Sequence, residues 1–475
     1  MIHRFSQHFL STAIALIITG AFGCVHYRPQ PISTAESAKT LEGRKLDDAG
    51  LKAFIATNAP ELAKEWPRPA WDLTGLTLVG LYYHPGLDVA RAQWQASRAS
   101  IITASARPNP SVSVTPEYTA NPASGLTPWI ATIQFDVPIE TAGKRHHRIV
   151  RAEQLAKAVF LQLASSGWKV RSDVRAGLVD WTVARLSSES LQRQYVLQSN
   201  VVAALEQRLA AGAVANSDVG LARIALSKTL VSAGEAKARS SAARVHLSQV
   251  LGLPLIALEG VEIQFDISAP PVDAERFTTA AIRQQSLQGR ADVLSALAEY
   301  AATEASLRLE IARQYPDVHL SPGYQYNQGE NKWGLGLAVE LPVLNQNQGP
   351  IAEANARRAE AAARFTSLQA GIINKLDAAG SAYHEAQEQL GVTEALVSSE
   401  AARYRTVEQQ VKAGDADPLD LLYAELERLL GENARLDARS RLQNAIGQLE
   451  DAVQQPLDAP EMRTIDLSRN PRANP

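Results

Sequence analysis

Hydrophobic residues recur every seven positions along two very long stretches of the chain, residues 141–211 and 349–413. The repeat falls on Tyr195, Val202 and Leu209 in the first stretch, and on Leu390, Val397, Tyr404 and Val411 in the second. A strict seven-residue repeat indicates helices that supercoil with a left-handed twist. A helix over 141–211 would be about 105 Å long at 1.5 Å per residue. The pattern predicts long antiparallel coiled-coil hairpins, with return helices over about 217–251 and 418–452.

Between these helices, large apolar residues alternate with small or polar ones. The predicted strands are 111–118, 129–139, 317–326 and 332–343. Strands of about 9–11 residues with one apolar face and aromatic ends are typical of membrane barrels, although a strand in a soluble sandwich alternates in the same way. Beside such long helices we favour the barrel. We expect lipid to contact Trp129, Ile133, Phe135, Trp333, Leu335, Leu337 and Val339, and the lumen to be lined by Thr132, Gln134, Asp136, Ala338 and Glu340.

The chain contains an internal duplication. Each half has the predicted order helix, strand, strand, long helix, turn and helix, and the first helices span about 86–106 and 290–314. The segment Gln207-Arg-Leu-Ala-Ala-Gly212 matches Gln409-Gln-Val-Lys-Ala-Gly414, and an Asp follows each Gly by six residues. The expected organisation comprises a tail with short helices (24–70), a first repeat (71–272), a second repeat (273–455) and a C-terminal tail (456–475).

The first 23 residues have the layout of a signal peptide, with a weakly basic start, a short apolar run and small residues. Cys24, the only cysteine, follows this segment at the position that a bacterial lipoprotein signal gives to its acylated residue. We therefore expect Cys24 to be lipidated and to anchor the mature chain. Ordinary cleavage after Gly23 is the alternative. After Cys24 there is no run of 18 apolar residues.

Composition narrows the class of protein further. Hydrophobic residues make up 45% of the chain and charged residues 20%, so it can bury a core, and a net charge of −3 argues against a nucleic-acid partner. One cysteine excludes an internal disulfide and a zinc site built on several cysteines. His146 and His147 point about 100° apart on a helix, so they chelate poorly. With Lys144, Arg145 and Arg148 they are predicted to form a solvated basic patch.

Three motifs resemble those of outer-membrane efflux ducts of the TolC family. The first is Gly334-Leu-Gly-Leu-Ala-Val-Glu-Leu-Pro342-Val-Leu-Asn345-Gln-Asn347-Gln348-Gly349, similar in its second part to the CzcC-like branch for heavy-metal efflux. The second is Pro138-Ile-Glu140-Thr-Ala-Gly143-Lys144-Arg145, in which Ala142 replaces the first Gly of the family pattern. The third is the turn Lys412-Ala-Gly414 followed by Asp420-Leu-Leu. The likeness covers about residues 70–455.

The resemblance implies a mainly α-helical fold with a transmembrane β part. Three chains would each give four strands to a twelve-stranded barrel, and their helices would form a hollow cylinder through the periplasm. The implied function is a passive exit duct of a tripartite efflux system in the outer membrane. Its partners would be outer-membrane lipid, a periplasmic adaptor and an inner-membrane pump of the RND type, and its cargo would be metal cations.

Two groups of acidic residues are candidate sites. Asp136 and Glu340 lie at duplicated positions on the polar side of the strands and are expected to form an acidic ring that favours cations, unless they are merely solvated or salt-bridged carboxylates. Asp218 and Asp420 lie just after the turns at Gly212 and Gly414, where the resemblance implies a periplasmic tip that docks the adaptor and closes the duct. The simpler account is that both aspartates stabilise helix N-termini, with Asp417 as the N-cap of one return helix and Asn216 or Ser217 as the cap of the other.

Other functions fit the sequence less well. The chain lacks a Walker-type phosphate loop, a Gly-x-Ser-x-Gly motif and a His-Glu-x-x-His motif. We therefore expect no enzyme activity, no cofactor, no catalytic residues and no resident metal. A duct for drugs or solvents and a type I secretion duct remain open as alternatives within the same fold. A coiled-coil envelope protein without a pore is the alternative from another class.

Overall fold

The computed structural model describes residues 26–268, 279–457, 467 and 472, which fall into two compact units divided between Arg44 and Lys45. In the first unit, α2 (Thr34–Glu42) begins at Ser33, whose side chain accepts a hydrogen bond from the Glu36 N–H at 3.3 Å. The predicted signal peptide and Cys24 lie outside the described residues.

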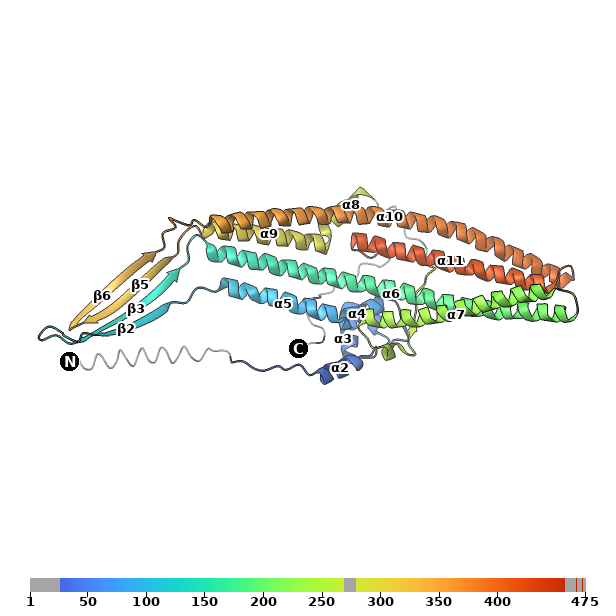
Figure 1. The fold of residues 1–475 in the computed structure, drawn as a ribbon, viewed down its shortest axis with the longest axis horizontal. Coiled ribbons are helices and arrows are strands. Elements are labelled where there is room, and N and C mark those ends of the chain that lie inside the picture. Colours follow the sequence, from blue (N-terminus) through green and yellow to red (C-terminus); the bar gives the residue numbers. More distant parts are fainter. Residues whose placement is uncertain (1–25, 269–278, 458–466, 468–471, 473–475) are drawn as a thin grey trace. The chain divides into compact units, whose positions relative to one another are not determined.

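Two long helical hairpins dominate the second unit (Figure 1). The helices are α5 (Pro85–Ser105), α6 (Lys144–Ala210), α7 (Asn216–Leu251), α9 (Ala291–Ala312), α10 (Gln348–Ala413) and α11 (Pro418–Val453). All six helices were predicted to within two residues at each end, apart from the first residue of α6. At 1.5 Å per residue α6 extends about 100 Å. The heptad positions are buried or half-buried, as Val202 and Val397 illustrate, so the seven-residue repeat is the packing stripe.

Both repeats use the same arrangement of one long helix and two shorter ones. Helices α5 and α7 follow each other along α6, and α9 and α11 follow each other along α10 (Figure 1). The two repeats are joined because α6 also packs against α9 and α11. One core cluster lies among α8 (Ala280–Gly289), α9, α10 and α11, and includes the buried Tyr383. Among the described residues, none of the helices is both long and apolar enough to cross a membrane.

Four strands form one antiparallel sheet at the end of the long helices opposite the hairpin turns (Figure 1). Their order is β2 (Ser111–Tyr118), β3 (Trp129–Ile139), β5 (Val318–Asn327) and β6 (Glu330–Val339). The central pairing of β3 with β5 connects the two repeats. The prediction that β6 extends to residue 343 is wrong. Its last pair is Val339 with Val318, where β5 begins, so Glu340 has no partner strand.

A second core packs against the middle of α6 and the C-terminal end of α7. It is built from α3 (Ala49–Asn58), η2 (Pro60–Ala63), β1 (Ala70–Trp71), α4 (Leu73–Tyr83), η3 (Leu255–Leu258) and β4 (Glu262–Ile263). Strand β1 pairs in parallel with β4. Helix α4 is buried over most of its length, and Asp72 begins it by accepting the Gly75 N–H at 2.9 Å. Short helices were expected within residues 24–70, where α3 and η2 lie, but the layer that they form with α4 was not predicted, because these segments are too short to show a period.

Candidate functional site

The four-stranded sheet has one apolar face and one polar face. Residues directly opposite each other in antiparallel strands lie on the same face, and on one face every pair joins two apolar or aromatic side chains except Tyr326 with Asn331. The apolar face consists of Val112, Val114, Pro116, Tyr118, Trp129, Ala131, Ile133, Phe135, Val137, Ile139, Val318, Leu320, Pro322, Tyr324, Tyr326, Trp333, Leu335, Leu337 and Val339. Several of its side chains are strongly exposed, with Leu335 at 75% and Leu337 at 68%. All the residues predicted to contact lipid lie on this face.

Aromatic side chains gather on the apolar face at the end of the sheet where loops connect β2 to β3 and β5 to β6. Tyr118 and Trp129 meet edge to face with ring centroids 5.1 Å apart, and Tyr324 lies 4.9 Å from Trp333. Aromatic rings with one apolar and one polar end favour the boundary between lipid and water. The sheet therefore has an exposed apolar band with aromatic residues at one border.

Asp136 lies on the polar face and contacts a histidine that the sequence patterns did not single out. His319 Nδ1 lies 3.0 Å and 3.1 Å from the two carboxylate oxygens of Asp136. His319 is directly opposite Pro138 on β3 and Ala338 on β6, so Asp136 reaches it diagonally. The carboxylate expected to stand in an acidic ring is thus already paired.

Glu340 is exposed and follows the last residue of β6. Across the sheet, Asp136 of β3 is level with Ser321 of β5, which in turn pairs with Gly336 of β6. Gly336 precedes Glu340 by four residues. The sheet does not bring the two carboxylates together within one chain. Whether they form a common ring in an assembly stays a prediction.

A network of hydrogen bonds joins the sheet to the long helices. Asp317, directly before β5, accepts from Lys144 Nζ at 2.7 Å and from the Thr141 N–H at 2.9 Å. Burial by itself would raise the pKa of Asp317, but these two donors outweigh burial and lower the pKa below its ordinary value. Arg148 pairs with Glu140, and Arg145 donates to the Ser105 carbonyl at 2.7 Å. The prediction of a solvated basic patch is therefore wrong for these three cations.

The same junction explains two of the sequence motifs. Gly143 is the residue directly before α6 and has φ +73°, and Asn347 is the residue directly before α10, at the matching position of the second repeat, and has φ +61°. Only Gly, and to a lesser degree Asn, adopts this left-handed conformation readily. Asn347 also donates from Nδ2 to the Glu310 carbonyl at 2.8 Å. Ala142, which replaces a family glycine, has φ +54° and carries the strain that a glycine would avoid.

We therefore expect Ala142→Gly to stabilise the chain by about 1 kcal/mol, because a left-handed non-glycine residue costs about 1–2 kcal/mol. Gly143→Ala is the matched control and should destabilise by a similar amount. An added Cβ at Gly143 would meet its nearest atom, His147 Nε2, only at 3.8 Å, so sterics contribute little. Guanidinium unfolding at a fixed protein concentration measures both variants. If the native protein and both variants were equally stable, the backbone at Ala142 and Gly143 would not be strained.

The two turns at the far end of the helices share one backbone geometry. Gly212 has φ +73° and Gly414 has φ +82°. The Ala213 N–H bonds to the Arg208 carbonyl at 2.8 Å, and the Asp415 N–H bonds to the Gln410 carbonyl at 2.9 Å. A six-to-one bond around a left-handed glycine is a Schellman motif. The duplicated glycines are therefore required by the turn itself.

Asp218 and Asp420 lie in the first turns of the return helices, as predicted. Asp218 Oδ2 accepts from the Ala215 N–H at 3.2 Å, and Asp420 Oδ2 accepts from the Asp417 N–H at 3.4 Å. Asp417 is the predicted N-cap of α11 and accepts the Leu419 N–H at 2.8 Å. For α7 the predicted cap was Asn216 or Ser217, and this is wrong. Ala215 precedes the helix, and Asp218 binds its N–H from within the first turn.

The two tips contact each other within the chain. Arg208 near the end of α6 forms an ion pair with Asp417, and Leu419 packs into a cluster with Val202 and Val219. The hydrogen bond from Arg208, followed by that from the Leu419 N–H, lowers the pKa of Asp417. Since the pKa is lower in the folded state, this contact stabilises the fold above the ordinary Asp pKa. The stabilisation is lost as the pH falls through the lowered value.

A buried ion cluster connects α6 to α11 near the middle of the unit. Arg171 binds Glu450 through two hydrogen bonds of 2.8 Å and 2.9 Å, and Arg175 Nε lies 3.3 Å from the same carboxylate. Arg175 also donates to the Gln443 carbonyl at 2.7 Å. The Glu450 side chain is only 2% exposed. This cluster locks the first repeat to the second, and the sequence patterns did not reveal it.

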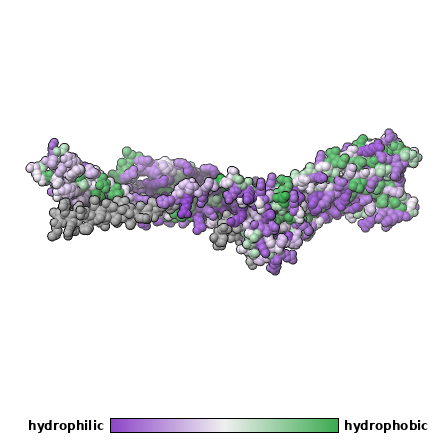
Figure 2. All heavy atoms as spheres, turned by 90° about the horizontal axis from the view of Figure 1, so that it is seen from below, coloured by the Kyte–Doolittle hydropathy of each residue, from purple (hydrophilic) through white to green (hydrophobic). Residues whose placement is uncertain are grey.

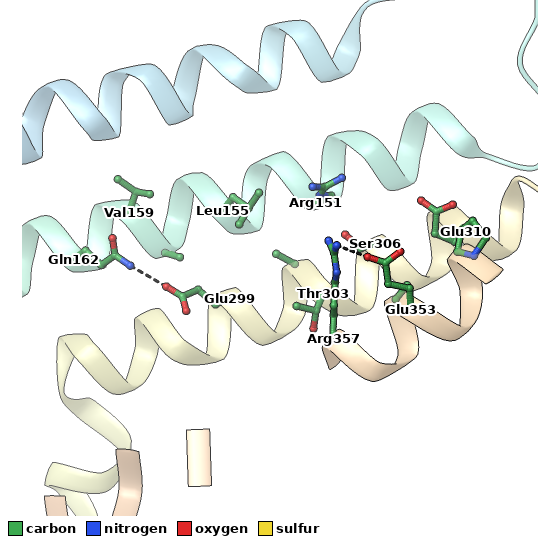
Figure 3. Close-up of a pocket in the computed structure, with 14 residues that line it drawn as sticks. Arg151, Leu155, Val159, Gln162, Glu299, Thr303, Ser306, Glu310, Glu353 and Arg357 are labelled. Atoms are coloured by element: carbon green, nitrogen blue, oxygen red, sulfur yellow. Dashed lines mark hydrogen bonds and ion pairs between the residues drawn. The ribbon is translucent and has the colours of Figure 1, made fainter. Parts of the chain in front are cut away.

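A cavity of about 440 Å³ lies among α6, α9 and α10 (Figure 3). Four of its charged residues, Glu299, Glu310, Glu353 and Arg357, have polar partners. Gln162 Nε2 donates to Glu299 Oε1 at 2.8 Å, Arg357 pairs with Glu353, and Glu310 accepts from Asn347. Within the described parts of the chain, no group of three or more His, Cys, Asp or Glu side chains is arranged to hold a metal ion.

Comparison with known proteins assigns the family. The sequence profile of the outer membrane efflux protein family matches residues 81–253 and 282–453, which is more than half of the chain. The chain belongs to this family. The two matched segments each hold one set of long helix, return helix and strands, so the outer membrane efflux protein profile follows the duplication seen in the fold.

Two curated relatives of this outer membrane efflux protein come from Cupriavidus metallidurans. It is 26% identical over 271 residues to the cobalt-zinc-cadmium resistance protein CzcC, covering 56% of this chain and 61% of CzcC. It is 27% identical over 294 residues to the nickel and cobalt resistance protein CnrC, covering 60% of this chain and 67% of CnrC. The match thus spans about three fifths of CzcC.

A solved structure shows the same fold. The CmeC outer membrane channel of Campylobacter jejuni superimposes with a TM-score of 0.67 over 94% of either chain, at 16% sequence identity. This outer membrane efflux protein therefore has the mainly helical architecture with a small sheet that TolC-like channels share. The family is defined by efflux rather than by a chemical reaction.

Proposed function

We propose that three copies of this chain form the exit duct of a tripartite efflux system in the outer membrane. Each copy would contribute its four strands to a twelve-stranded barrel, and the helices would form a cylinder that extends into the periplasm. The observation that carries this proposal is the sheet, which has a largely apolar exposed face, a polar opposite face and two unpaired edges, β2 and β6.

The physical argument for a trimer comes from the backbone. Lipid cannot satisfy the N–H and C=O groups of an open sheet edge, so a sheet in lipid must close. Four strands are too few, since known barrels begin at about eight. Pairing β6 of one copy with β2 of the next closes the sheet, and apolar side chains then face lipid while the polar face lines the lumen.

The decisive measurement is single-channel recording of the purified protein in a planar bilayer. A duct should give stable conductance steps with a linear current–voltage relation. Cross-linking should give a trimer. A well-folded protein that never conducts would favour the alternative of a coiled-coil envelope protein without a pore.

The cargo we propose is divalent metal cations, delivered by an inner-membrane pump through a periplasmic adaptor. The support is the likeness to two metal-resistance proteins, named for cobalt, zinc, cadmium and nickel. Cells that lack this chain should lose tolerance to these metal salts and regain it with the intact gene. Loss of tolerance to hydrophobic drugs alone would instead support the drug or solvent alternative.

The adaptor is proposed to dock at the hairpin turns. If the sheet lies in the outer membrane, these turns lie about 100 Å away at the inner end of the cylinder. Hydrophobic patches appear among hydrophilic side chains near this end (Figure 2). On α7, the apolar side chains of Leu221, Ile224 and Val231 are exposed. Single cysteines at Ala213 and Ala416 should cross-link to the adaptor in cells. Cross-linking only to components of the outer leaflet would reverse the proposed orientation.

Asp218 and Asp420 are proposed to narrow the opening for cations as well as to stabilise their helices. The double variant Asp218→Ala, Asp420→Ala should raise the resting conductance, and the loss of each helix-dipole contact should cost about 0.3–1 kcal/mol. Asp415→Ala is the control, because this exposed aspartate lies in the same turn region before α11 begins. Unchanged conductance with intact helices would leave both aspartates only a structural role.

A further inference from the structure

On the polar face of the described sheet, His319 and Asp136 form the one pair of an imidazole with a carboxylate. Both side chains are 41% exposed, so neither is buried as a structural core pair would be. The imidazole nitrogen in contact is Nδ1, at 3.0 Å and 3.1 Å from the two carboxylate oxygens. The other ring nitrogen, Nε2, is not engaged by Asp136.

The chemistry of the pair determines where the proton lies. An ionised carboxylate can only accept hydrogen bonds, so Nδ1 must carry the hydrogen that joins the two groups. In the neutral ring Nε2 then holds the lone pair. A carboxylate that binds the N–H of a histidine fixes the ring orientation and makes the opposite nitrogen a better metal ligand. Asp136 thus orients the His319 ring and makes Nε2 a better metal ligand, rather than binding cations itself.

The surroundings leave room for an ion at this histidine. On β6 the polar-face position opposite it is Ala338 and the next toward the strand start is Gly336, and on β5 the next is Ser321. These are among the smallest side chains, so no bulky side chain of these positions crowds the His319 ring. Glu340 comes two residues after Ala338, the cross-strand partner of His319, and adds a second carboxylate farther toward the helices.

We propose that His319 Nε2 is a transient contact for borderline divalent cations such as Zn²⁺, Co²⁺ and Ni²⁺ as they pass the sheet, with Asp136 as its positioning residue. Imidazole suits these ions, whereas Mg²⁺ prefers oxygen ligands. One imidazole with water as the remaining ligands binds weakly and releases quickly, as conduction demands. The inference rests on the proposed duct, because the polar face is a lumen only in that assembly.

The test measures metal binding at His319 directly, without relying on conductance. Diethyl pyrocarbonate modifies a free imidazole, and mass spectrometry of the purified assembled protein reports the modification at His319. Zn²⁺, Co²⁺ and Ni²⁺ should protect His319, and Mg²⁺ at the same concentration should not. Asp136→Asn should raise the Zn²⁺ concentration needed for protection by about 10–100-fold. Absence of protection, or equal protection in Asp136→Asn, would overturn the proposal.

Channel recording provides the second arm and separates this proposal from the duct itself. Zn²⁺ should block the Na⁺ current briefly in the native protein, and His319→Gln should remove this block while it retains the open conductance. A protein that conducts but gives neither protection nor block would refute the metal contact and leave the duct standing. A protein that is protected but never conducts would refute the duct and retain the metal contact.

Discussion

Leu335→Arg should destabilise the membrane-inserted protein by about 2–4 kcal/mol, the cost of an arginine on the lipid face at the bilayer midplane. Strand β6 runs from Glu330 to Val339, so Leu335 lies near its centre, and its side chain is 75% exposed on the apolar face. Leu337 is closer to the end of the strand. Leu337→Arg should therefore cost less than Leu335→Arg.

The matched control is the adjacent residue on the other face. Gly334 lies opposite Gly323, and a Cβ added there would meet no atom within 4 Å. Gly334→Arg should therefore be tolerated within about 1 kcal/mol, because its charge reaches the water-filled lumen of the proposed duct. Guanidinium unfolding from phospholipid vesicles, together with the yield of the proposed trimer, measures the three variants. Equal costs at positions 334 and 335 would contradict the assignment of the two faces.

Glu450→Ala should cost about 3–5 kcal/mol, because it leaves buried guanidinium groups without their carboxylate. Glu450 is 2% exposed, and Arg171 and Arg175 beside it are 8% and 5% exposed. The exposed pair of Arg185 and Glu189 on the same helix α6 is the control, since its side chains are 41% and 53% exposed. Glu189→Ala should cost only about 0–1 kcal/mol.

A double variant distinguishes two contributions to the loss of stability, namely the unpaired buried charge and the lost ion-pair contact. Arg171→Leu combined with Glu450→Leu removes one arginine together with the carboxylate, so Arg175 is the one guanidinium of the cluster that loses its carboxylate, and replacing a buried pair by apolar residues is often close to neutral. The double variant should therefore be more stable than Glu450→Ala. The unfolding free energies must be compared at one protein concentration, because assembly adds to the apparent stability. If Glu450→Ala costs no more than Glu189→Ala, the cluster does not bear on the packing of α6 against α11.

Periodicity predicted the features that depend on one repeated spacing. The seven-residue repeat through Val202 and Val397 located both long helices, and alternation through Trp333 and Leu337 located the strands and their faces. These predictions succeeded because burial along a regular element repeats with the period of that element. The duplicated glycines at the turns were found for the same reason, since both repeats need the same left-handed residue.

Interactions between distant segments could not be predicted in this way. Arg171 and Glu450 look like solvated charges on amphipathic helices, and only packing of α6 on α11 buries them together. His319 depends on the pairing of β3 with β5, which no local pattern encodes. The early end of β6 depends on where its partner strand begins. Local composition favours an element, whereas its limits and its buried polar contacts depend on the neighbour that packs against it.

The two hairpins differ slightly in length, and this difference bears on the symmetry of the assembly. Gly212 follows Gly143 by 69 residues, whereas Gly414 follows the matching Asn347 by 67 residues. Of these two extra residues one is helical, because α6 has 67 residues and α10 has 66, and one helical residue extends the first hairpin by about 1.5 Å. In the proposed trimer the inner rim would then alternate between three deeper and three shallower tips. A protein that meets this rim would encounter six similar hairpins arranged with threefold rather than sixfold symmetry.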